Sequence, residues 1–363
     1  MKITDIKIGL VAGSVVAFSS LFSQAVQQPA CKPQVCCVSQ EPCPPADAAY
    51  VAPARIDVKC PWDFFAFGSF TYTQPMQDNM EYAVISNTTS TILGLDWEYQ
   101  KTDMGFKPGF KVGLGMNFDR DDWDSLIQYT WFRGSQTTSS SVDPAGSEGL
   151  VPLWSTPSAV DFFTSGSIKW RLNMDLLDYE LGRWGYYGRQ AIIRPFVGAR
   201  AAWIRQKADT SYADSVNSDS LIQNESTNSW AIGPRAGFQT NWMIGEGFRF
   251  YGNGAGDILF TRYTKLKSSI ETIVAGVLTS FGSTVEKNLN TLRAHLECEL
   301  GFGWGTYLDC NKWHIDLALG YGFQVFFDQN MFRHFEEAGA IHSTVDNGNL
   351  YMQGLNASIR LDF

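Results

Sequence analysis

The stretch WHIDLALGYGFQV, residues 313–325, places a large apolar side chain at every odd position and a small or polar one at every even position. A repeat of two puts successive side chains on opposite faces of a β-strand, whereas a helix needs a repeat of about 3.6. One face of this strand is therefore apolar, and the other carries His314, Asp316, Gln324 or very small residues. The stretch predicts a long strand that separates an apolar environment from a polar one.

The same alternation recurs along the chain. It is equally regular in residues 106–118, 292–304 and 351–363. Weaker versions at about 63–74, 122–133, 161–183, 190–206, 228–243 and 247–264 bring the well-marked strands to ten. Within 161–183 the apolar positions change parity near Leu176 and Leu177, which we interpret as a β-bulge.

The connections between these strands alternate in length. Brief turns are expected at 119–122, 184–189, 244–247 and 308–312. Longer stretches rich in Ser, Thr, Asn and Asp are expected at 75–104, 134–160, 207–227, 265–287 and 329–348. Short turns on one side and long loops on the other are typical of a bacterial outer-membrane β-barrel. Further strands hidden at 80–85, 92–99 and 268–281 would raise the number toward sixteen.

The main alternative fold is a soluble β-sandwich, which also alternates apolar and polar residues. A sandwich of this length needs two domains and a linker, and the body of the chain contains no linker-like segment. Trp residues on the apolar parity, among them Trp131, Trp203 and Trp230, also suit an aromatic girdle at a membrane surface. We therefore predict an all-β, transmembrane antiparallel barrel over residues 62–363.

The first residues indicate export. Lys2 and Lys7 precede an apolar run at 8–22, and small residues follow, so residues 1–25 are predicted to be a signal peptide. Residues 26–61, rich in Pro and Cys, are predicted to be a periplasmic tail. The candidates for disulfide formation are Cys31, Cys36, Cys37, Cys43, Cys60 and Cys310. Neither a C-x-x-C repeat nor a nearby His supports a metal site in this tail.

Charged residues on the parity opposite the apolar face are the candidates for lining the lumen. They are Lys107, Lys111, Lys169, Arg171, Arg194, Arg200, Arg235, Arg249, Asp257, Arg293, Glu297, Glu299, Asp316 and Arg360. Charges of both signs fit a transverse field across an aqueous pore, but they also fit salt bridges that plug a narrow barrel. The number of strands decides between these outcomes, since eight leave an interior just filled by side chains and sixteen leave a channel.

Several motifs resemble one family. They include FGSFTY at 67–72, KPGFKVGLG at 107–115, LDYELGR at 177–183 and IGPRAG at 232–237. Together they resemble the major-outer-membrane-protein-like porins of Legionella and of the environmental relatives of Chlamydia, over about residues 62–363. The resemblance implies an outer-membrane porin whose cysteine-bearing tail can join a disulfide-linked envelope network. Thr73 departs from it, because a Trp is expected there, and the terminal Phe363 is similar to the assembly signal of outer-membrane proteins.

The expected function is passive diffusion of ions and small hydrophilic solutes across the outer membrane. The alternative is a structural or adhesive surface protein without an open pore. Expected partners are outer-membrane lipid, small solutes, and disulfide-linked envelope proteins or further copies of the chain; no nucleic acid and no cofactor are expected. The sequence contains neither a G-x-S-x-G motif nor a metal-ligand cluster, so we expect no catalysis.

Overall fold

The computed structural model describes residues 54–59, 62–87, 98–118, 122–146, 148–154, 162–187, 190–332 and 347–363. The chain divides into two units, residues 1–44 and 45–363, of which the first lies outside the described residues. The predicted signal peptide and the candidates Cys31, Cys36, Cys37, Cys43 and Cys60 also lie outside them. The described part of the chain holds no helix long and apolar enough to cross a membrane.

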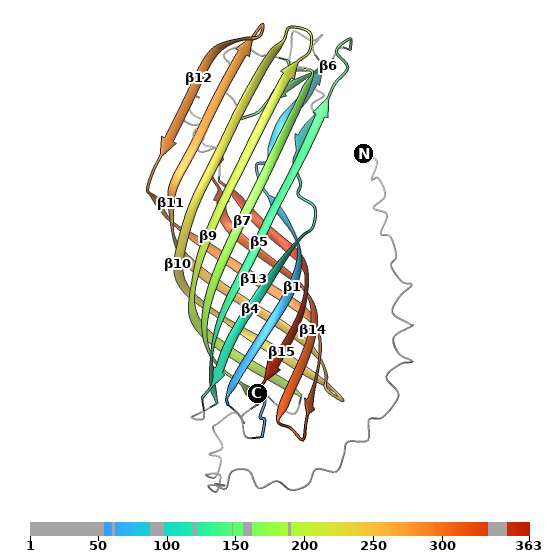
Figure 1. Ribbon diagram of the computed structural model, residues 1–363, viewed down its shortest axis with the longest axis vertical. Helices are drawn as coiled ribbons and strands as arrows, with labels where there is room; N and C mark the ends of the chain where they lie inside the picture. The colour runs from blue at the N-terminus through green and yellow to red at the C-terminus, as the bar shows by residue number, and fades with distance from the viewer. Residues whose placement is uncertain are drawn as a thin grey trace. The chain divides into compact units, whose positions relative to one another are not determined.

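Ten antiparallel strands pair in a closed ring, which confirms the predicted barrel (Figure 1). They are β1 (Phe64–Gln77), β4 (Lys107–Asn117), β5 (Trp123–Ser141), β7 (Ser165–Arg183), β9 (Ala191–Asp214), β10 (Asp219–Gly245), β11 (Phe248–Val274), β13 (Leu289–Leu308), β14 (Trp313–Asn330) and β15 (Gly348–Asp362). Each strand pairs with the next in this series, and β15 pairs with β1 to close the ring. At the closure the Phe363 backbone nitrogen donates to the Phe64 carbonyl at 3.1 Å.

The additional strands expected inside the loops exist but do not enlarge the barrel. β2 (Glu81–Asn87), β3 (Glu98–Lys101) and β6 (Glu148–Pro152) form a separate three-stranded sheet. β12 (Val277–Glu286) pairs only with β11, and β8 (Gly185–Tyr187) only with β9. The barrel therefore has ten strands, and the upper limit of sixteen was wrong.

Tight turns gather at the end of the barrel that holds Phe64 and Phe363, here called the short-turn end. Two residues join β10 to β11 there, and four join β13 to β14. In the second turn Asp309, Cys310 and Asn311 have φ of 47°, 58° and 69°. Asp and Asn are among the residues that most readily adopt this left-handed region. The predicted turns at 244–247 and 308–312 are thus found at this end, whereas residues 119–121 and 188–189 of the other two lie outside the described part of the chain.

The opposite end of the barrel, where the strands are longest, is here called the long end. Two of the loops predicted there consist mostly of strands. β9 continues to Asp214 and β10 begins at Asp219, so 207–227 is mostly a hairpin. In the same way 265–287 is mostly β11 and β12. Strands β9, β10 and β11 contain 24, 27 and 27 residues, whereas β1 and β4 contain 14 and 11, so the long strands rise beyond the others (Figure 1). The prediction failed because outward side chains that meet water are polar, and polar strands resemble loops in composition.

The predicted bulge in 161–183 was also wrong. β7 pairs with β5 and β9 without a register shift, and its even-numbered residues face inward throughout. Toward the long end the inward residues are apolar, as at Trp170 and Leu172, and toward the short-turn end they are Asp178 and Glu180. The apolar residues change parity along β7 because the surroundings of the strand change. The geometry of the strand itself stays regular.

An apolar core lies inside the long end of the barrel. Inward residues of β7 and β9 pack there with the three-stranded sheet, including Trp170, Tyr212, Tyr82 and Trp154. The Tyr212 hydroxyl donates to the Tyr82 carbonyl at 2.6 Å, and the Trp154 indole nitrogen donates to the Glu81 carbonyl at 2.7 Å. Both buried polar groups are therefore satisfied, and the small sheet is fixed to the inner wall.

Candidate functional site: the barrel interior

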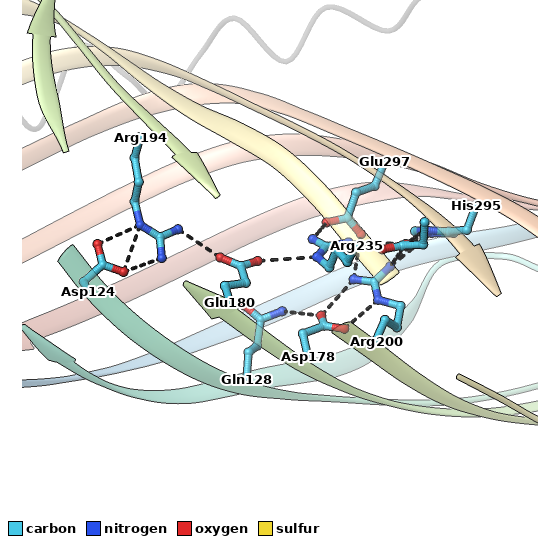
Figure 2. A network of polar contacts seen from close by, with 10 residues as sticks. Asp124, Gln128, Asp178, Glu180, Arg194, Arg200, Arg235, His295 and Glu297 are labelled. Atoms are coloured by element: carbon cyan, nitrogen blue, oxygen red, sulfur yellow. Dashed lines mark hydrogen bonds and ion pairs between the residues drawn. The ribbon is translucent and has the colours of Figure 1, made fainter. Parts of the chain in front are cut away.

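A chain of buried charges runs along the inner wall below the apolar core (Figure 2). It begins at Arg194 on β9, whose Nε donates to Asp124 Oδ2 at 2.8 Å and whose Nη1 donates to Glu180 Oε2 at 2.9 Å. The side chains of Arg194 and Asp124 are only 2% and 1% exposed. Because strand alternation turns Asp124, Glu180 and Arg194 inward from β5, β7 and β9, the contact joins three successive strands.

Arg235 on β10 continues the chain from Glu180. Its Nε lies 3.4 Å from Glu180 Oε1, and its Nη1 donates to Asp257 Oδ1 at 3.2 Å. Its Nη2 also pairs with Glu297. One guanidinium thus binds three carboxylates from β7, β11 and β13, which uses the fork of donors that distinguishes Arg from Lys.

Arg200 forms the other end of the chain. Its Nε donates to Asp178 Oδ1 at 2.6 Å, and its Nη1 and Nη2 donate to Asp257 at 3.0 Å and Glu297 at 3.1 Å. His295 contacts Asp257 through Nδ1, which also lies 2.9 Å from Arg200 Nη1. We call Asp124, Asp178, Glu180, Arg194, Arg200, Arg235, Asp257, His295 and Glu297 the charge network (Figure 2).

The energetics of the network make it rigid. Removing ions from water is costly, and that cost is offset only where each ion keeps several well-aligned partners. Three guanidiniums and five carboxylates satisfy one another here, with Arg200 and Asp257 almost wholly buried. Loss of one partner would leave its neighbours charged, buried and with fewer partners to offset the cost of burial. The network therefore fixes the wall formed by β5, β7, β9, β10, β11 and β13.

A cavity of about 270 Å³ lies beside the network. The wall formed by β1, β4, β14 and β15 lines it with small or hydroxyl side chains, such as Ser69, Thr71 and Ser358, and also with Lys111 and Arg360. The opposite side carries Arg235 and Glu297 of the network. Charged side chains therefore border the cavity on both walls.

Different residues border the cavity at its two ends. Toward the long end it meets Phe132, Met174 and Met352, which belong to the apolar core. Toward the short-turn end it meets Arg249, whose Nη2 donates to Asp316 Oδ1 at 2.7 Å. The cavity is therefore bordered by polar side chains toward the short-turn end and by apolar ones toward the long end.

Most of the lumen candidates do face inward. Those that line the cavity are Lys111, Arg235, Arg249, Glu297, Glu299, Asp316 and Arg360. Arg194, Arg200 and Asp257 lie in the charge network. Lys107 donates to Gln136 at 3.4 Å, and Arg293 pairs with Asp328 at 3.3 Å and contacts Met331 near the long end.

Lys169 and Arg171 require a correction, because the structure places them on the outer face of β7. They alternate with Ile168, Trp170 and Leu172, which point into the apolar core. The bulge assumed within 161–183 assigned these two residues to the inner face. Asp178 and Glu180 were missed as candidates, although both alternate with the outward Tyr179 and could be found from parity alone.

His295 and Asp257 resemble part of a catalytic pair, but their surroundings differ from those of a catalytic site. Both side chains are 0% exposed, and the two ring nitrogens of His295 contact Asp257 and, at 3.4 Å, Gln324. The described residues include no group of three His, Cys, Asp or Glu suited to a metal ion. The imidazole is placed to complete the network.

Two cysteines lie among the described residues. Cys298 is unpaired and exposed on the outer face of β13. Cys310 lies in the turn between β13 and β14. The neighbouring Asn311 carbonyl accepts a hydrogen bond from the Lys59 backbone nitrogen at 2.7 Å, so the segment that precedes the barrel runs past this turn.

The comparison with solved structures found likenesses at low sequence identity. The outer membrane protease OmpT from Escherichia coli is 10% identical, with a TM-score of 0.36, over 84% of this chain and 98% of that one. A Pseudomonas aeruginosa FadL homologue is 7% identical, with a TM-score of 0.24, over 83% of this chain and 90% of that one. The P. putida toluene transporter TodX is 8% identical, with a TM-score of 0.17, over 83% and 90%.

None of these likenesses bears on activity, and the sequence matches none of the curated proteins with which it was compared. A family model, that of the Legionella pneumophila major outer membrane protein precursor, matches residues 58–363. The match includes every strand of the barrel. The chain therefore belongs to this family and is a β-barrel protein of the bacterial outer membrane.

Proposed function

We propose that this protein is a narrow porin, which passes ions and small hydrophilic solutes along the wall formed by β1, β4, β14 and β15. The observation that carries the proposal is the cavity inside the barrel, whose lining includes charged and hydroxyl side chains. Its lining of Ser69, Thr71 and Ser358 offers hydroxyl groups to a hydrated solute, and Lys111 faces Glu297 and Glu299 across it. Charges of opposite sign on facing walls orient water and ions in transit.

The bore follows from the number of strands. Ten strands lie just above the eight whose side chains fill the interior, so little space remains beside the charge network. The apolar core at the long end must shift for solutes to pass. The three-stranded sheet contributes to that core but does not belong to the ring of strands that forms the barrel. We therefore propose low conductance, gated at the long end, with no catalytic role.

Planar bilayer recording tests the proposal. Purified full-length protein should give stepwise ionic conductance. Lys111→Glu should shift the reversal potential in a salt gradient toward cation preference, because Lys111 lines the cavity. The matched control is Lys265→Glu, which makes the same charge change at an exposed position of β11. Equal shifts in both variants would contradict conduction through this cavity.

The packed interior supports a second function, that of a closed structural barrel. Apolar side chains fill the long end, and the charge network is almost wholly buried. A folded, inserted protein that stays silent over a range of voltages would favour this role over the porin. Deletion of residues 81–101, which contain β2 and β3, separates the cases further: a gated channel should then conduct more, and a barrel closed by its network should remain silent.

We also propose that Cys310 forms a disulfide with a cysteine of the tail or of another envelope protein. The Lys59–Asn311 hydrogen bond supports this, because Cys60 follows Lys59 directly and consecutive Cα atoms are about 3.8 Å apart. Gel mobility without reductant should differ from mobility with it, and Cys310→Ser should remove part of the difference. Cys298→Ser is the control, and identical mobility under both conditions would contradict the proposal.

A further inference from the structure

The outer face of the long strands carries three tryptophans that strand register places in one row. Strand register aligns Trp131 on β5, Asp175 on β7, Trp203 on β9 and Trp230 on β10 in a single row across four strands. The next outward row toward the short-turn end is apolar, with Tyr129, Leu177, Ala201 and Ile232. Trp at the edge of an apolar band marks the level of lipid headgroups. This row therefore marks one membrane surface.

The membrane surface in question belongs to the outer leaflet. Short turns face the periplasm in outer-membrane barrels, and the Trp row lies on the long-end side of the apolar band. Beyond the row, β5, β7 and β9 continue for about ten more residues each, so their outer faces stand at and above the headgroups.

The three outward rows immediately above the Trp row carry five basic residues and one carboxylate. The first holds Arg133, Asn173, Arg205 and Asn228; the second Ser135, Arg171, Lys207 and Ser226; the third Thr137, Lys169, Asp209 and Asn224. Five cations thus gather on β5, β7 and β9 against the two carboxylates Asp175 and Asp209. We call Arg133, Lys169, Arg171, Arg205 and Lys207 the outer basic cluster. It is positive on a chain whose net charge is −9.

The contacts within the cluster leave donors available. Arg133 Nη2 lies 2.8 Å from both Asp175 oxygens, and Arg205 Nη2 lies 3.4 Å from Asp175 Oδ2. Arg171 pairs with Asp209, and its Nε is buried, so that atom is not available to a ligand. Within the same residues neither Lys169 nor Lys207 makes an ion pair, and both are exposed. The carboxylates therefore hold the arginines in place without neutralising the cluster.

We propose that the outer basic cluster binds the phosphorylated headgroup of a lipid in the outer leaflet. Neighbouring strands lie about 4.8 Å apart and successive rows about 7 Å apart, so the cluster covers roughly 10 by 14 Å. That area suits a sugar headgroup bearing phosphate. Guanidinium groups bind phosphate through paired hydrogen bonds, and the Trp row below contacts the start of the acyl chains. The site is separate from the lumen, so it holds whether or not the barrel conducts.

Binding of a defined lipid tests the site. The full-length protein in neutral detergent is titrated with a bisphosphorylated diglucosamine lipid, and binding is followed by quenching of Trp fluorescence or by native mass spectrometry. Lys169→Thr/Arg171→Ser/Lys207→Ser should weaken binding on the order of tenfold to a hundredfold, since each basic residue at a headgroup surface contributes to attraction. The control, Lys59→Ser/Lys101→Ser/Lys312→Ser, loses the same charge before β1, on β3 and in the turn between β13 and β14, and should bind like the unaltered chain.

Three outcomes would overturn the proposal. Equal loss in the control would show attraction by net charge alone, and equal binding of the dephosphorylated lipid would exclude phosphate recognition. Inorganic phosphate that binds as tightly as the lipid would indicate a site for a free anion. If the triple variant does not fold, the single variant Lys207→Ser carries the test, because this exposed side chain has no ion pair among the described residues; unchanged binding would then contradict the proposal.

Discussion

The two halves of β7 present opposite chemistry on the same inward face. From Ile168 to Leu176 the inward side chains are apolar, whereas Asp178 and Glu180 below them are charged. The outward side chains change in the reverse sense, from Lys169 and Arg171 to Leu177 and Tyr179. The comparison shows that the solvent outside the barrel decides what the inside can be. Where lipid surrounds the wall the interior is polar, and where water surrounds it the interior is a soluble-type core.

The largest loss of stability should come from a substitution within the charge network of the polar half. Arg200→Ala leaves Asp178, Asp257 and Glu297 without their shared cation, and such a loss costs about 3–5 kcal/mol of unfolding free energy. Urea unfolding of the protein in lipid vesicles measures it. Arg171→Ala, on the water-facing outer wall, should cost at most about 1 kcal/mol because exposed pairs contribute little. Similar losses in both variants would contradict a special role for the buried network.

The packing of the apolar half is tested by a substitution that leaves a cavity in it. Leu172 is 0% exposed within the core, so Leu172→Ala should cost about 3 kcal/mol by lost burial and the space left behind. The same unfolding assay measures this, and Asn173→Ala, at the next and outward-facing position, is the control. A loss below about 1 kcal/mol would mean that the long end is loosely packed.

Lysine substitutions at two positions of β9 test where the boundary between the two halves lies. Val197→Lys puts a charge three outward rows below Trp203, on the face that meets lipid, and should cost about 2 kcal/mol. Ser211→Lys, four outward rows above Trp203, should cost almost nothing because its side chain meets water. Equal stability of the two variants would place the membrane surface elsewhere than at the Trp row.

Parity was sufficient to predict much of the fold and part of the site. The strict alternation of residues 313–325 and its repeats led to ten barrel strands, and inward parity identified Arg194, Arg200 and Arg235 correctly. It failed at 161–183, because a strand that leaves the membrane reverses its apolar parity without any bulge. It failed again at 207–227, because polar strands above the membrane have the composition of loops.

The sequence by itself pointed to a closed sheet with lipid on one side, because the two-residue period runs through the body of the chain without the linker that a two-domain sandwich needs. Only the tertiary structure decided what fills the lumen. Asp124 and Arg194 lie 70 residues apart, and Arg200 and Glu297 lie 97 apart, so their pairing depends on which strands become neighbours and at what register. The same register gathered Arg133, Arg171 and Lys207 from three strands on the outer wall. Alternation assigns a residue to a face, but closure of the barrel brings residues of one face together.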